Sequence, residues 1–182
     1  MRAYDVVLFV HLLGVVTLFA AFGIFQLGGA RLRRAATMDH LRLWLGLLRP
    51  TGAIFPIALL VILVAGLYMA DDAWSYSTPW VVVAFVAVVV MLAVGGVVIT
   101  RGLNRLGAAA AGAGDGPPPA PLRRLVADPA TWVSSFALNG TAVGVLWLMA
   151  TKPGWGGSVG VVTALTVAGA LLGTAVVRAP RT

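Results

Sequence analysis

Five long apolar stretches dominate this chain and limit what it can fold into. Crossing a hydrocarbon core about 30 Å thick takes roughly 20 helical residues, and each stretch is close to that length or longer. We place the stretches at about residues 4–30, 52–70, 79–100, 129–151 and 156–177. The chain is therefore predicted to be an all-α, polytopic membrane bundle of five transmembrane helices, forming a single membrane domain over residues 1–182.

Composition supports the membrane class and narrows the chemistry. Hydrophobic residues make up 60% of the chain and charged residues 10%, and the mean hydropathy is +0.96, far from the values of soluble domains. The absence of cysteine excludes disulfides, thiolate metal sites and thiol catalysis. The sequence also lacks a Ser/His/Asp arrangement, paired carboxylates, a phosphate loop and an HExxH motif. We therefore predict no catalytic residues and no dedicated metal site.

The basic residues are distributed asymmetrically and predict the orientation. Eleven arginines lie in the loops after the first and third stretches and in the C-terminal tail, and only Arg2 and Lys152 lie on the other side. Loops rich in Lys and Arg stay in the cytoplasm, so we predict an outside N-terminus and a cytoplasmic C-terminus. This asymmetry accounts for most of the net charge of +7, and no nucleic-acid partner is needed to explain it.

Two segments between the stretches have distinct patterns. Residues 37–49 carry apolar side chains at helical spacing, which predicts an amphipathic interfacial helix whose apolar face lies on lipid or on the bundle. These side chains are Leu41, Trp44, Leu45 and Leu48. Residues 107–121 are rich in Gly, Ala and Pro without apolar periodicity, and they predict a flexible cytoplasmic linker.

Small residues recur at helical spacing in the last two stretches. They are Gly140 and Gly144 in the fourth stretch, and Gly156, Gly160, Ala164, Ala168, Gly169 and Gly173 in the fifth. Such spacing lets two helix backbones approach closely, so these residues are predicted to pack the last two helices together. The fifth stretch has two such ridges, which leaves open that one of them serves a homo-oligomer or a larger complex.

Strongly polar side chains are rare inside the stretches. His11, Gln26 and Asn139 are the main ones, and no Asp, Glu, Lys or Arg lies in the interior of a stretch. That absence argues against an ion-coupled transporter, which usually needs a charged relay. At 1.5 Å per residue, His11 lies about 10 Å below the outer end, level with Gly144 and Thr163. We therefore expect a glycine to leave space beside His11 and a threonine to bond it.

Three interpretations of His11 follow. In the first, a neutral imidazole bonds a neighbouring helix and serves packing only. In the second, His11 is an axial ligand of haem b; a single histidine in the spans excludes bis-histidine ligation within one chain. In the third, His11, Met69 and Met149 are soft copper ligands near the outer face, although these methionines are predicted to lie at shallower depth.

Several motifs resemble a known family. These are "VVLFVHLLGVVTLFAAFGIF", "LVILVAGLYM", "PWVVVAFVAVVVMLAVGGVV" and "LWLMATKPGWGGSVGVVTALTVAGALLG". Together they resemble a bacterial family of predicted integral membrane proteins, domain-of-unknown-function family 2269, which implies a bacterial inner-membrane location and no established activity. An early histidine in the first span is more distantly similar to the copper-resistance D proteins and the membrane protoporphyrinogen oxidases, where it implies haem handling. Only His11 is carried over, because the lysine of the oxidase family's later span has no counterpart here.

The sequence thus predicts a membrane protein that is embedded in lipid, is not an enzyme, and acts through helix packing as a homo-oligomer or an accessory subunit. The alternative is a small haem-binding or metal-handling membrane protein that uses His11. An absorbance spectrum with and without haemin distinguishes the two hypotheses, since only the second predicts a Soret band that depends on His11.

Overall fold

The computed structural model describes residues 2–179, and within them the fold is entirely helical. The helices are α1 (Ala3–Arg33), α2 (Met38–Leu48), α3 (Thr51–Ala73), α4 (Pro79–Val94), α5 (Thr100–Ala111), α6 (Ala120–Val126), α7 (Pro129–Thr151) and α8 (Trp155–Arg178). A π-helical turn, η1 (Gly95–Ile99), joins α4 to α5. Five helical segments are long and apolar enough to cross a membrane, as the sequence predicted.

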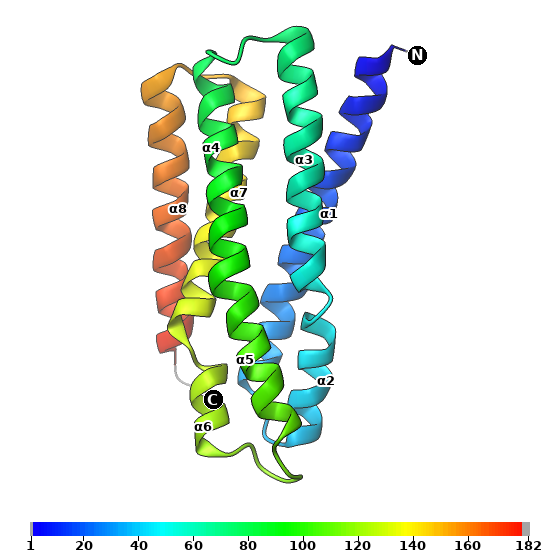
Figure 1. Ribbon diagram of the computed structural model, residues 1–182. Coiled ribbons are helices and arrows are strands. Elements are labelled where there is room, and N and C mark those ends of the chain that lie inside the picture. The colour runs from blue at the N-terminus through cyan, green and yellow to red at the C-terminus, as the bar shows by residue number, and fades with distance from the viewer. Residues whose placement is uncertain (1, 180–182) are drawn as a thin grey trace.

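The long helices run roughly along one axis and form two groups (Figure 1). In the first group α1 packs along α3, and in the second α7 packs closely on α8 and also contacts α4. We call the end where α1 begins and α3 ends the upper end, and the end formed by α2, α5 and α6 the lower end (Figure 1). Contacts between α3 and α4 are sparser, so the two groups meet less tightly.

Local sequence signals explain where several helices begin and end. Pro79 and Pro129 occupy the first turns of α4 and α7, where a missing N–H costs nothing. Asp128 caps α7 by accepting hydrogen bonds from the backbone N–H groups of Ala130 (3.2 Å) and Thr131 (3.1 Å). Lys152 ends α7 in the left-handed conformation, with φ 50°, and the chain then reverses into α8.

The core of the lower half is aromatic and centres on Trp132. The ring of Trp132 lies 5.4 Å from that of Phe25, and its Nε1 donates to the carbonyl of Val126 at 2.7 Å. The guanidinium carbon of Arg33 lies 4.7 Å from the Trp132 ring centroid. Gly29 makes this packing possible, because a Cβ there would overlap the indole ring. This cluster joins the lower part of α1 to α7.

The two small-residue ridges of α8 have different surroundings. Gly169 and Gly173 face α7, where Gly140 and Gly144 leave room for the partner backbone; a Cβ on Gly140 would lie 2.9 Å from the carbonyl carbon of Leu165. The predicted packing of the last two helices is thus present in the structure. The second ridge is exposed and faces away from α7, and its residues are Gly156, Gly160, Ala164 and Ala168.

The segment predicted as an interfacial helix forms α2 and packs its apolar face on the bundle. Met38, Leu41, Leu45 and Leu48 are all buried, and α2 contacts both α1 and α5. The sequence left open whether this apolar face contacts lipid or the bundle, and in the structure it contacts the bundle. The helix is therefore part of the lower core.

The linker predicted over 107–121 is shorter and more ordered than expected. Alanines continue α5 to Ala111, and α6 begins at Ala120, because alanine favours helix wherever packing permits it. The loop between them is tied to α2: the N–H of Met38 donates to Gly116 at 2.8 Å, and Arg42 bonds Asp115 at 2.9 Å. Arg42 also donates to the carbonyl of Ala113 at 2.6 Å. The predicted bounds of the linker were therefore too wide, because helix occupies both of its ends.

Candidate functional site

The most distinctive cavity lies at the upper end, between the two helix groups. It has a volume of about 270 Å³, close to the lower limit of the roughly 300–1,000 Å³ typical of small-molecule sites. Side chains of α1, α3, α4 and α7 line it, and most of them are apolar or aromatic. The lining also includes four side chains that can ligate or carry charge, namely one with an imidazole, two with thioethers and one with an ammonium.

His11 supplies the imidazole. Its side chain is 95% buried, with a relative exposure of 5%, and its Nδ1 lies 3.1 Å from the carbonyl oxygen of Ile62 on α3. A carbonyl only accepts hydrogen bonds, so Nδ1 carries the proton and Nε2 keeps its lone pair. Within residues 2–179, Nε2 has no hydrogen-bond partner, and it does not belong to the fully buried side-chain nitrogens that lack a partner. The lone pair is therefore available to a molecule in the cavity.

The neighbours of His11 differ from those predicted. Its ring lies beside Gly66 on α3, where a Cβ would stand 3.7 Å from Cε1. Gly144 instead leaves room for Val162 on α8, and Thr163 is exposed. The prediction that Gly144 and Thr163 flank His11 was wrong because depth gives the height of a residue but not the direction in which its helix turns it.

Met69 and Met149 line the same cavity as His11. They come from different helix groups, Met69 from α3 and Met149 from α7, and lie near the upper ends of those helices. The three residues that the copper interpretation named thus line one cavity. Thioether sulfur is a soft, neutral ligand, and methionine is flexible enough to adjust its position.

Lys152 also lines this cavity, and the sequence reasoning had assigned it to a loop without a role. Its ammonium lies 4.5 Å above the ring centroid of Trp74, close enough for a cation–π interaction. The left-handed backbone at Lys152 turns the chain at the cavity's edge. The signal that could have found it is the T-K-P-G junction, which forces α7 to stop just above Met149.

No family model matches the chain, and no curated protein or solved structure matches it.

The other polar residues predicted inside the spans lie away from His11. Gln26 donates to the hydroxyl of Ser135 at 3.3 Å, which links α1 to α7 in the lower half. Asn139 is half-buried on α7, and its side chain makes no hydrogen bond within the described residues. Residues 2–179 contain no group of three or more His, Cys, Asp or Glu side chains placed to hold a metal ion. Of the predicted ligands, the cavity is lined by the imidazole of His11 and the thioethers of Met69 and Met149.

Proposed function

We propose that this chain is a multi-pass membrane protein that holds a soft metal ion in the cavity, with Nε2 of His11 as a ligand. The observation that carries this proposal is the 3.1 Å contact between Nδ1 of His11 and the carbonyl of Ile62. Metal-binding histidines usually give their second ring N–H to such an acceptor, which fixes the tautomer and orients the ring. The hydrogen bond between His11 and Ile62 has this form.

The donor set favours monovalent copper. Imidazole nitrogen and thioether sulfur are soft or intermediate ligands, and Met69 and Met149 line the cavity with His11. Haem fits the donors but not the space: the imidazole suits its iron and Lys152 suits a carboxylate, yet a cavity of about 270 Å³ is smaller than a porphyrin. Haem binding would require the α1–α3 pair to move away from α4 and α7, whereas a single ion is much smaller than the cavity.

Titration with Cu(I) tests this proposal. The purified protein competes anaerobically with a chromogenic Cu(I) chelator, and we expect one equivalent to bind. His11→Ala should weaken binding by more than about 100-fold, because losing even an outer-shell partner of a metal ligand costs 10–100-fold. Met69→Leu and Met149→Leu should each weaken it by a smaller factor, since thioethers are weak neutral ligands and leucine conserves their volume.

His40→Ala is the matched control, because His40 is exposed on α2 at the lower end. It should leave Cu(I) affinity unchanged. A parallel haemin titration separates the two ligands: a Soret band that vanishes in His11→Ala, without Cu(I) binding, would replace copper with haem. Failure to bind either ligand would refute a metal-centred role for the cavity.

We propose as a second function that α8 mediates association with another copy of the chain. Only Ser158 and Gly173 are buried on α8, and the ridge of Gly156, Gly160, Ala164 and Ala168 is exposed. No atom would lie within 4 Å of a Cβ on Gly156 or Gly160, so a second backbone has space to approach there. In lipid, close backbone approach at small residues provides the dispersion contacts that hold helices together.

Gly160→Leu should weaken self-association about tenfold, because its side chain would keep a second helix away from the ridge. Single-molecule photobleaching in liposomes at graded protein density measures the dimer fraction. Gly23→Leu is the control, since Gly23 is exposed on α1 and likewise has no atom within reach of a Cβ. Equal dimer fractions for the wild type and Gly160→Leu would contradict the role of this ridge.

We further propose that the protein lies in a bacterial inner membrane with the cavity in the outer half. The distribution of Lys and Arg supports this orientation, since the arginine-rich loops belong to the lower end.

A further inference from the structure

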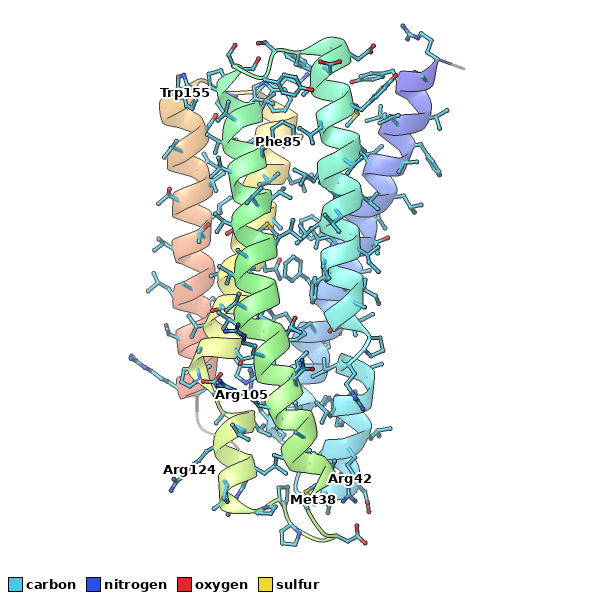
Figure 2. All side chains as sticks on the ribbon, viewed as in Figure 1. Met38, Arg42, Phe85, Arg105, Arg124 and Trp155 are labelled. Carbon is cyan, nitrogen blue, oxygen red and sulfur yellow. The ribbon has the colours of Figure 1, made fainter. Side chains whose placement is uncertain are left out.

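A group of arginines at the lower end has no carboxylate partner. Arg101 and Arg105 on α5 and Arg124 on α6 line an open groove of about 650 Å³, which the start of α7 closes on one side. Figure 2 shows Arg105 and Arg124 at this end of the bundle. None of the three arginines forms an ion pair within residues 2–179. Their positive charge therefore has no counter-ion from the described chain.

The acids at this end are engaged elsewhere. Asp39 and Asp115 both pair with Arg42, at 3.9 Å and 2.9 Å. Asp128 lines the groove, but its two carboxylate oxygens accept hydrogen bonds from the backbone of Ala130 and from the N–H and hydroxyl of Thr131. The capping role orients Asp128 toward the first turn of α7. The groove is thus strongly positive despite the acid in its wall.

The groove is also amphipathic. Val97 and Val98 of η1 line its upper part, and Leu125 of α6 lines the side. Val97 is 48% exposed, and Val89 and Val90 higher on α4 are exposed as well. A molecule bound here would place a charged group among guanidinium groups and an apolar portion along valine side chains. That arrangement matches a lipid whose headgroup lies at the membrane surface.

We infer that this groove binds the phosphate of an anionic phospholipid, with its acyl chains along Val97, Val98 and the exposed face of α4. Guanidinium groups hold phosphate oxygens through paired N–H donors, and basic pockets between transmembrane helices bind such headgroups. The apolar wall favours the lipid over free phosphate, because free phosphate has no apolar part to contact the valine side chains. The site is distinct from the cavity at His11, which lies at the opposite end of the bundle (Figure 1).

Native mass spectrometry in a neutral detergent tests the inference. The wild-type protein should retain phosphatidylglycerol in preference to phosphatidylcholine, because the two lipids share acyl chains and differ in net charge. Arg105→Gln/Arg124→Gln should bind phosphatidylglycerol about 30-fold more weakly. Each arginine near an anionic headgroup strengthens binding about fivefold, and the two factors multiply. Both arginines are exposed, so the variant should fold, and its thermal unfolding without added lipid should match the wild type.

Arg31→Gln/Arg49→Gln is the matched control, because it removes the same charge from exposed positions outside the groove. It should keep wild-type affinity for phosphatidylglycerol. Equal losses in the two double variants would show a general charge effect and overturn the site. Displacement of the lipid by inorganic phosphate at similar concentration would also overturn it, because a free anion would then suffice.

Discussion

Gly140→Ala should lower the free energy of unfolding by about 3 kcal/mol, although alanine is the better helix former. The new Cβ would overlap the carbonyl of Leu165 and lie 3.4 Å from the Cα of Gly169. Both obstacles are backbone atoms, so no rotamer change can relieve them, and α8 would have to move away from α7. Unfolding in mixed micelles of increasing SDS content measures the difference.

Gly23→Ala is the control for this substitution. It makes the same chemical change on α1, where no atom lies within 4 Å of the new Cβ. It should leave stability unchanged or raise it slightly, because only the helix propensity of alanine remains. If Gly140→Ala is as stable as Gly23→Ala, the close approach of α7 and α8 is not what holds this pair together.

Trp132→Ala should lower the free energy of unfolding by about 4 kcal/mol, in the range usual for removing a buried tryptophan. The indole is 2% exposed, contacts Phe25 and Arg33, and fills the space that Gly29 leaves. Its loss would leave a cavity where α1 meets α7 and would leave the carbonyl of Val126 without the Nε1 donor. Thermal unfolding in detergent, monitored by circular dichroism, provides the comparison.

Trp147→Ala is the matched control, because Trp147 is on the same helix but is 53% exposed. It should cost far less stability. Trp132→Phe should fall between the two variants, since it keeps most of the apolar volume and loses only the hydrogen bond to Val126. Equal effects of Trp132→Ala and Trp147→Ala would contradict a central role for Trp132 in the core.

The membrane helices could be predicted from the sequence because the hydropathy and the length of a segment depend on its own residues and not on how the segment packs. The stretches predicted to begin at residues 79 and 129 match the starts of α4 at Pro79 and α7 at Pro129, and the glycine spacing predicted the α7–α8 contact. Trp132 could not be recognised as the centre of the core. Nothing in the sequence distinguishes it from Trp147, because burial depends on which face of α7 meets α1.

The sequence singled out three residues that line one cavity, but it did not predict how they are arranged there. His11, Met69 and Met149 were singled out as rare donors inside apolar spans, and they do line one cavity. The partner of His11 is a main-chain carbonyl, that of Ile62, which every residue possesses and no motif reveals. Lys152 reaches the cavity through a left-handed turn, so its role depends on a backbone angle that side-chain patterns do not encode.

The π-helical turn η1 sets the angular phase between the two ends of one continuous helix. A π turn takes an extra residue into its hydrogen-bonded ring, and one residue corresponds to about 100° of rotation in an α-helix. One face of α4 lines the cavity that contains His11, and one face of α5 carries Arg101 and Arg105. The extra residue in η1 changes the angle between these two faces from the one that a regular α-helix would give. Each end of the helix can therefore point its side chains at a different site.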